Sequence, residues 1–216
     1  QGTLREFLDL AGRNFNVADD HPFGPLPRWG SMLMRWWQQH NPAGTARRNV
    51  AHHYDLSDTL YDLFLDTDRQ YSCAYWPSDD ITLEEAQEAK KRHIAAKLMI
   101  QPDSRVLDIG CGWGGMGLYL AEQGAQQVTG ITLSAEQETV ANRRAMASDQ
   151  AEKVRFRLQD YREVEDSYDR IVSVGMFEHV GAKHYREFFS HIKRILDEDG
   201  VFLQHSIGRM EPPGTT

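Results

Sequence analysis

Short apolar runs alternate with amphipathic stretches along the second half of the chain, after Pro102. Short apolar runs bounded by turn residues predict buried strands, and apolar positions at helical spacing predict helices between them. We expect strands over 105–109, 127–131, 154–159, 169–174 and 201–206. Three helices are expected between them: one over 116–123, one that begins at a capping box of Ser134 and Gln137, and one over 183–196. The alternation is typical of a doubly wound parallel sheet and predicts an α/β fold.

The last of these helices carries an apolar stripe along one side. An amphipathic helix normally turns such a stripe toward the core, so we interpret it as packing rather than as a site. The stripe consists of Tyr185, Phe188, Phe189, Ile192, Ile195 and Leu196.

The first hundred residues show helical periodicity and helix-start signals instead of strands. A Thr followed three residues later by Glu forms a capping box at two of these starts. Two helices are predicted over 4–11, capped by Thr3, and over 29–40. A third is capped by Ser57 and carries Leu60, Leu63 and Phe64 on one face, and a fourth is capped by Thr82 and runs to about Met99. We therefore expect an N-terminal helical region over residues 1–80 and an α/β domain over residues 81–216.

The composition is that of an ordinary globular protein, with 216 residues, 40% hydrophobic and 26% charged. No apolar run approaches the roughly 18 residues of a membrane span, and no signal peptide opens the chain. Cys73 and Cys111 cannot form a disulfide framework, and no spacing indicates a zinc site. We expect a metal-free cytoplasmic protein, soluble or peripheral to a membrane, whose sequence begins inside a longer gene product because residue 1 is Gln.

The net charge of −8 argues against a nucleic-acid-binding protein. The charge is uneven, however, since residues 1–50 carry six Arg against four acids and residues 21–50 carry no acid. That stretch combines basic with aromatic and aliphatic residues, a mixture that favours an anionic lipid surface. The residues concerned are Arg28, Arg35, Arg47 and Arg48 with Trp29, Trp36, Trp37, Met32, Leu33 and Met34. The alternative is a small helical subdomain with buried tryptophans.

A glycine-rich segment follows the first predicted strand and reads Asp-Ile-Gly-Cys-Gly-Trp-Gly over residues 108–114. In open α/β sheets a nucleotide-like cofactor lies outside such a turn, because glycine permits close approach of the backbone. Asp108 precedes the glycines, where a carboxylate can act on a cationic ligand. No acid stands at 130–134, about 20 residues on, where NAD sites hold an acid on the ribose. These features favour S-adenosylmethionine, a sulfonium without phosphates, over NAD or a nucleoside triphosphate.

The next strand end offers candidates for the adenine of that cofactor. Asp160 could accept a hydrogen bond from an exocyclic amine, and Tyr161 offers a face for stacking. An ordinary strand-end turn is the alternative interpretation.

Four separated segments resemble the cyclopropane fatty acid synthase family, which includes the mycolic acid cyclopropane synthases. They are His-Tyr-Asp-Leu-Ser at 53–57, Tyr-Ser-Cys-Ala-Tyr-Trp at 71–76, the glycine loop with Gly-Ile-Thr-Leu-Ser at 130–134, and Gly-Met-Phe-Glu-His-Val-Gly at 175–181. The resemblance covers roughly residues 47–210. It implies a Rossmann-like class I S-adenosylmethionine-dependent methyltransferase fold whose last two strands, and one tyrosine of the site, lie beyond residue 216.

The resemblance also implies a reaction. Family members transfer the methyl of S-adenosylmethionine to a cis double bond of a lipid acyl chain and close a cyclopropane ring, with bicarbonate as the base. It implies bicarbonate ligands at Cys73, Glu178 and His205, with backbone near Val174 and Ile207. It implies cofactor contacts at Tyr71, Ser72, Gly110, Gly112, Thr132, Leu133, Gln137, Tyr161 and Arg162, to which the glycine loop and the third strand end add Asp108, Gly114 and Asp160. Unsaturated membrane phospholipid at the inner membrane face, and a homodimer, are the implied partners.

The proposed chemistry explains these residue types. An alkene is a poor nucleophile, so catalysis depends on alignment with the sulfonium methyl in a dry site, and the resulting carbocation needs apolar or aromatic walls. Candidates for the walls are Tyr71, Tyr75, Trp76, Phe177 and Trp113. A weak base, bicarbonate held by Glu178 and His205, would then remove a proton.

Several alternatives remain open at the level of the sequence. Without the resemblance, Cys73 and His205 would be interpreted as buried structural side chains, and Glu178 as part of a polar turn. The same carbocation could yield a methyl-branched or hydroxylated lipid, and the acceptor could be a small molecule. A cofactor-binding partner subunit without catalysis is the alternative from another class.

Overall fold

The computed structural model describes residues 3–14 and 58–208. The chain divides into two units, Gln1–His40 with Pro213–Thr216, and Asn41–Pro212. In the first unit helix α1 spans Leu4–Asn14. The Thr3 amide donates to Glu6 Oε2 at 2.7 Å and the Glu6 amide donates to Thr3 Oγ1 at 3.3 Å, which confirms the predicted capping box. The predicted helix 29–40, the Ser57 cap and the basic aromatic stretch 28–48 lie outside the described residues.

The second unit is built on a five-stranded sheet in the order β3-β2-β1-β4-β5, and every neighbouring pair is parallel. The strands are β1 (Arg105–Ile109), β2 (Gln127–Thr132), β3 (Val154–Leu158), β4 (Tyr168–Val174) and β5 (Leu196–His205). The predicted doubly wound α/β sheet is confirmed. Strand β5 begins at Leu196 instead of Val201, with a shift of register against β4 between Tyr168 and Arg170.

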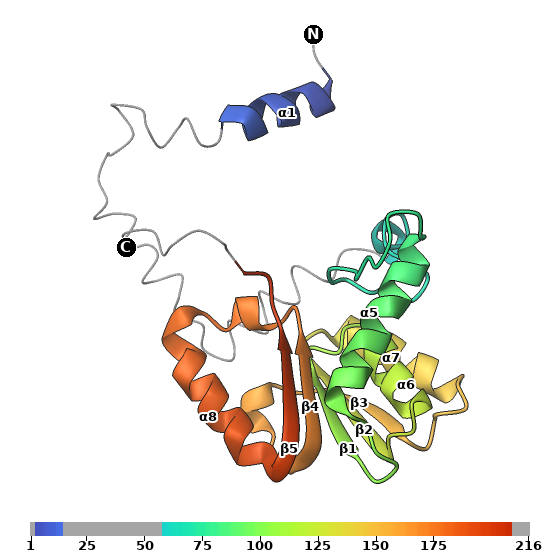
Figure 1. The fold of residues 1–216 in the computed structure, drawn as a ribbon, viewed down its shortest axis with the longest axis vertical. Helices are drawn as coiled ribbons and strands as arrows, with labels where there is room; N and C mark the ends of the chain where they lie inside the picture. The colour runs from blue at the N-terminus through green and yellow to red at the C-terminus, as the bar shows by residue number, and fades with distance from the viewer. Residues whose placement is uncertain (1–2, 15–57, 209–216) are drawn as a thin grey trace. The chain divides into compact units, whose positions relative to one another are not determined.

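Helices cover both faces of this sheet (Figure 1). On one face lie α5 (Leu83–Leu98), α6 (Gly115–Glu122) and α7 (Ala135–Met146), and on the other lies α8 (Tyr185–Ile195). Alternate strand residues serve the two faces, so Val106 packs with the first group and Leu107 with α8. Each face of the sheet therefore has its own core. The shorter elements are α4 (Asp58–Tyr61) and the 3₁₀ turns Tyr161–Glu163, Phe177–His179 and Ala182–His184.

The helix expected behind Ser57 is much shorter than predicted. It ends at Tyr61, and Leu63 and Phe64 are exposed in the turns that follow. The backbone beyond Tyr61 forms turns instead, and further along the Asp66 side chain accepts a hydrogen bond from the Gln70 amide. The expectation of a longer amphipathic helix was therefore wrong.

The stripe on α8 is core only in part. Phe188, Ile192 and Ile195 are buried, whereas Tyr185 is 38% and Phe189 is 46% exposed. Helix α8 packs on β5, the last strand in the sheet order, so its stripe is wider than the described sheet surface beneath it. Assignment of the whole stripe to the core was wrong for these two residues.

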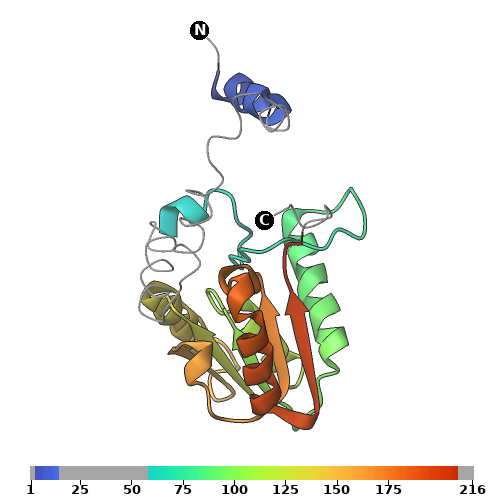
Figure 2. The same ribbon diagram turned by 90° about the vertical axis from the view of Figure 1, so that its left-hand side faces the viewer.

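Residues 58–80, which the sequence assigns to the N-terminal region, belong to the same unit as the sheet. In Figure 2 the loop between α4 and α5 lies beyond the arrowheads of β4 and β5. The boundary at residue 80 stays a prediction for the chain as a whole. Among the described residues, no helix is long and apolar enough to cross a bilayer.

Candidate active site

The site expected from the sequence lies at the carboxyl end of the sheet, where β1 and β4 are neighbours. The chain leaves these two strands toward opposite sides, and ligands of open α/β sheets bind in the crevice at such a switch point. The loops after the two strands touch, because a Cβ placed on Gly110 would lie 2.9 Å from Cβ of Met176. The glycine loop and the β4 loop therefore form one continuous surface.

The glycine loop needs its glycines for two different reasons. Gly110, Gly112 and Gly114 all have positive φ angles, of 81°, 54° and 87°. A Cβ on Gly112 would meet no atom within 4 Å, so backbone there borders open space that a ligand can enter. A Cβ on Gly114 would lie 2.7 Å from the ring of Phe156, so that glycine serves packing.

Asp108 lies directly beneath this loop and is almost completely buried, at 2% exposure. Its Oδ2 has no hydrogen-bond partner in the part of the chain that the structure describes. Burial raises the pKa of this carboxyl to about 7, while the charge of Lys90 acts in the opposite direction. A buried carboxylate with an unsatisfied oxygen fits a cationic ligand above it, and S-adenosylmethionine carries such a charge.

The turn after β2 gathers two of the predicted cofactor residues. Thr132 Oγ1 donates to Gln137 Oε1 at 2.8 Å and accepts from the Ser134 amide at 3.2 Å. The Ser134 hydroxyl caps α7, but the Gln137 side chain bonds Thr132 and not the cap backbone, so the predicted capping box is only half formed. Leu133 is half-buried within this turn.

The turn after β3 holds the other predicted contacts. Asp160 is buried, and Arg162 engages both of its carboxylate oxygens, with Nη2 at 2.6 Å from Oδ2 and Nε at 2.9 Å from Oδ1. The ring of Tyr161 packs edge-on against Phe188 at 5.2 Å between centroids. In this structure the Asp160 carboxylate therefore orders Arg162, and its role toward an adenine stays a prediction.

The segment Tyr71–Trp76 lies beside the end of β4. The Ser72 Cβ would be 3.8 Å from a Cβ on Gly175, and the Cys73 side chain is exposed and free of any disulfide. Tyr71 is half exposed, whereas Tyr75 stacks on His93 of α5 at 4.7 Å.

The other three aromatic candidates for the walls differ in exposure, and Trp76 is the most exposed of them, at 49%. Trp113 is buried against Tyr61, so we correct its assignment to core packing. Phe177 is half-buried and stacks on Tyr185, with 4.3 Å between ring centroids.

The ends of β4 and β5 bring four of the predicted catalytic residues together. Val174 pairs with His205, and the Gly175 amide donates to the His205 carbonyl at 3.1 Å. Glu178 Oε1 accepts a hydrogen bond from the Ile207 amide at 2.7 Å. His205 Nδ1 is buried without a partner among the described residues. An unsatisfied ring nitrogen beside a fixed carboxyl fits a small oxyanion that both donates and accepts hydrogen bonds.

The sequence analysis missed the side chains that hold the 70–72 segment in place. Gln87 Nε2 donates to the carbonyls of Gln70 and Ser72 at 3.1 and 3.0 Å. Lys90 Nζ donates to Ser72 Oγ at 2.6 Å. The only signal in the sequence was weak: two polar residues three apart on α5, among the buried alanines of its inner face.

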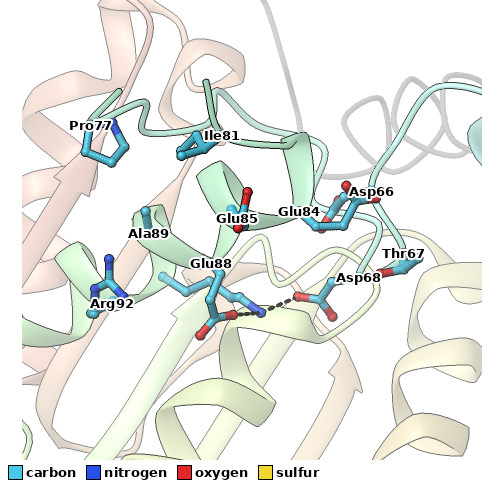
Figure 3. A pocket seen from close by; sticks show the side chains of 11 residues that line it. Asp66, Thr67, Asp68, Pro77, Ile81, Glu84, Glu85, Glu88, Ala89 and Arg92 are labelled. Atoms are coloured by element: carbon cyan, nitrogen blue, oxygen red, sulfur yellow. Dashed lines mark hydrogen bonds and ion pairs between the residues drawn. The ribbon is translucent and has the colours of Figure 1, made fainter. Parts of the chain in front are cut away.

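A second network holds the preceding residues. Arg144 of α7 donates to the carbonyls of Trp113 and Asp68 at 2.8 and 3.2 Å and pairs with the Asp68 carboxylate. Lys91 Nζ lies 2.9 Å from Asp68 Oδ2 and 2.9 Å from Glu88 Oε2. Asp68, Glu88 and Lys91 line a cavity of about 530 Å³ that shares no lining residue with the predicted site; Figure 3 labels Asp68 and Glu88 at its edge. In the described ranges, no three His, Cys, Asp or Glu side chains gather to hold a metal.

Known proteins resemble this chain over most of its length. The family described as mycolic acid cyclopropane synthetase matches residues 42–216. The cyclopropane-fatty-acyl-phospholipid synthase of Escherichia coli (strain K12) is 51% identical over 156 residues, which are 72% of this chain and 40% of that protein. The chain therefore spans less than half the length of this relative.

Two solved structures show the same fold. Mycolic acid cyclopropane synthase CmaA1, complexed with SAH and CTAB, matches with a TM-score of 0.70 and 42% identity, over 73% of this chain and 55% of its own. Coclaurine N-methyltransferase, bound to N-methylheliamine and SAH, matches with a TM-score of 0.65 and 24% identity, over 80% of this chain and 54% of its own. The predicted class I methyltransferase fold is confirmed.

Proposed function

The chain belongs to the mycolic acid cyclopropane synthetase family, and from this premise we propose that it acts on unsaturated phospholipid. In the proposed reaction the methyl of S-adenosylmethionine is transferred to a cis double bond of an acyl chain, and a cyclopropane ring closes. One observation carries the proposal. The glycine loop over Asp108 and the hydrogen bond between Glu178 and Ile207 lie at the same end of the sheet. The name of the 51% identical relative supports phospholipid as the acceptor.

S-adenosylmethionine, when bound, supplies an electrophilic methyl on a sulfonium. In our proposal the open backbone at Gly112 admits it, and the buried carboxylate of Asp108 stabilises its charge from below. Tyr71, Ser72, Thr132 and Gln137 border the same end of the sheet and complete the cradle. The SAH complex of the 42% identical CmaA1 supports this choice of cofactor.

Ring closure needs a proton to leave the added methyl, and we assign that step to a site for bicarbonate, which supplies a weak base when bound. Glu178 is held by the Ile207 amide and would accept a hydrogen bond from the O–H of the anion. His205 would donate to its oxygens, and Cys73 would complete the ligands. Phe177 would exclude water, because water would quench a carbocation.

We also propose that the acceptor is reached at the inner face of a membrane by a cytoplasmic, dimeric protein. The supporting feature is the stretch 28–48, whose arginines and tryptophans suit an anionic surface. Sedimentation with vesicles should show binding to anionic phospholipid that weakens as salt rises, because the charges are screened. Equal binding to neutral vesicles would contradict this part of the proposal.

The reaction can be tested with cofactor whose methyl carries three deuterium atoms. The chain is incubated with that cofactor and vesicles of monounsaturated phospholipid, and the acyl chains are analysed by mass spectrometry. A cyclopropane retains two of the three deuterium atoms, because one leaves as the ring closes. Retention of all three would indicate methyl branching and overturn ring closure. SAH binding without any labelled lipid would favour the partner-subunit alternative.

Glu178→Gln is the matched variant for the same assay. Its amide oxygen can still accept the Ile207 hydrogen bond, so the loop geometry should persist, while the negative charge is lost. We expect SAH affinity to stay within about twofold and turnover to fall by roughly 10²-fold or more. An unchanged rate would remove Glu178 from the proposed base site.

A further inference from the structure

Helix α5 turns two polar side chains into the interior. Gln87 is 4% and Lys90 is 3% exposed, and they lie three residues apart on one helical face. A buried ammonium is costly because it leaves water, and burial lowers the pKa of Lys90 to about 8. Replacement of a whole buried ion pair by apolar side chains is often neutral, whereas removal of one partner alone is destabilising. The cost of burying Lys90 is therefore balanced by its partners, which include the Ser72 hydroxyl.

Lys90 forms a hydrogen bond to a residue of the predicted cofactor site. Its Nζ donates to Ser72 Oγ at 2.6 Å, while Gln87 fixes the carbonyl of the same residue at 3.0 Å. Ser72 in turn lies against Gly175 at the end of β4. The lysine therefore fixes one flank of the crevice.

Lys90 also acts on the floor of the crevice. Residues 106 and 108 point to the same face of β1, and Val106 packs with Ile94 and Leu98 of α5. The charge of Lys90 acts on the buried Asp108 carboxyl and lowers its pKa against the effect of burial. The lysine thus acts on the Ser72 loop through a hydrogen bond and on the acid beneath the glycine loop through its charge.

We propose that Lys90 is a positioning residue of the cofactor site, which holds the Ser72 hydroxyl and so fixes the 70–72 segment against the glycine loop. This inference rests on the proposed function, since it deepens the account of the same site. Other charged or titratable groups act on Lys90 from the surrounding elements, namely Asp66, Asp68, Lys91 and Cys73.

The first test separates positioning from a structural role. The 216-residue chain is prepared as wild type, Lys90→Met, Lys90→Gln and Lys97→Met, the last a control at an exposed lysine of the same helix. The unfolding temperature of each variant is measured first, so that SAH affinity is compared where all of them are folded, and we expect Lys90→Met to bind SAH about tenfold more weakly by calorimetry. Lys90→Gln should lie between, because an amide can donate to Ser72 without a charge. Lys97→Met should match the wild type in both measurements.

An SAH affinity of Lys90→Met equal to that of the wild type, measured where both are folded, would overturn the inference. A second measurement needs no ligand. In carbon-13 NMR of the Asp carboxyls, Lys90→Met should raise the pKa of Asp108 further, and an unchanged pKa would contradict an electrostatic interaction between them. Failure of the wild type to bind SAH would instead contradict the proposed function, and the NMR result would still decide the role of Lys90.

Discussion

Phe156 shows how single residues shape the floor beneath the glycine loop. A Cβ on Gly114 would lie 2.7 Å from its ring, a Cβ on Gly117 would lie 3.1 Å from it, and a Cβ on Gly130 would be closer still. The ring is buried and belongs to the core on the α5 side of the sheet. The missing side chains of three glycines thus make room for one aromatic ring that supports the loop.

Gly130→Ala should therefore destabilise the fold. The new Cβ would collide with the Phe156 ring and lie 2.9 Å from Cβ of Cys111, and overpacking of this kind costs about 1–3 kcal/mol. Urea unfolding should show a lower midpoint at an unchanged slope. Phe156→Leu in the same chain should recover part of the loss, as a double-mutant cycle would measure. A midpoint equal to that of the wild type would show that the ring can move away freely.

Asp108 should make stability depend on pH in the unliganded chain. Its pKa is raised from 3.8 to about 7, so the stability it contributes is complete below pH 4 and is lost as pH rises through 7. Asp108→Asn removes this dependence. The unfolding free energy of the variant relative to that of the wild type should therefore rise by a few kcal/mol between pH 4 and pH 8, since one pKa unit corresponds to about 1.4 kcal/mol. Unfolding free energies across that range would measure the gain. Asp103→Asn, at an exposed site, serves as the control, and parallel curves for Asp108→Asn would contradict the assignment.

At the scale of elements, Arg144 connects three segments that are distant in sequence. It lies on α7 and donates to carbonyls of the glycine loop and of the segment before α5. Burial alone would raise the pKa of Asp68, but the charges of Lys91 and Arg144 outweigh it and lower that pKa. The Asp68 carboxylate therefore adds stability above its ordinary pKa, and this contribution is lost as pH falls through the lowered value.

Arg144→Met should free the glycine loop from the 66–70 segment. The lost hydrogen bonds leave partly buried carbonyls unpaired, which we expect to cost about 1–3 kcal/mol. Hydrogen exchange should become faster at the amides around Trp113 and Arg69, and SAH affinity should fall. Arg143→Met changes an exposed neighbour on the same helix and should alter none of these quantities. Unchanged exchange in Arg144→Met would show that the connection is dispensable.

The elements that the sequence predicted well are those whose signals are local. Strands β1 to β4 are short apolar runs, and the Thr82–Glu85 capping box fixes the start of α5 as expected. The signal failed where a distant partner decides the outcome. Helix α4 ends at Tyr61 and leaves Leu63 and Phe64 exposed, and the exposure of Phe189 depends on how much of α8 the strand β5 can cover.

The same distinction applies to the site. Motifs after the strands identified Gly110, Glu178 and Thr132, because parallel strands bring their carboxyl ends to one edge of the sheet. No local pattern distinguishes Lys90 from the neighbouring Lys91, although one bonds Ser72 and the other bonds Asp68. Such contacts depend on the packing of α5 against a segment about eighteen residues away.

For the molecule as a whole, the crevice has two halves, which meet where the neighbouring strands β1 and β4 end. The half on β1 to β3 presents the glycine loop and Asp108, and the half on β4 and β5 presents Glu178 and His205. A ligand that bridges β1 and β4 should therefore stabilise the fold against global unfolding, because it binds only the folded state.

Thermal unfolding with added ligand tests this at the level of the whole chain. SAH at a hundred times its dissociation constant should add about 2.7 kcal/mol, which for a chain of this length corresponds to a rise in Tm of roughly 5–10 °C. NAD should produce no rise, because no acid stands at 130–134 to hold its ribose. The rise with the sulfonium-bearing S-adenosylmethionine should be smaller in Asp108→Asn at the same ligand concentration, since the amide cannot stabilise a positive charge. A rise with NAD and none with SAH would mean that the crevice takes a different cofactor, and the chemistry assigned to Glu178 and His205 would lose its methyl donor.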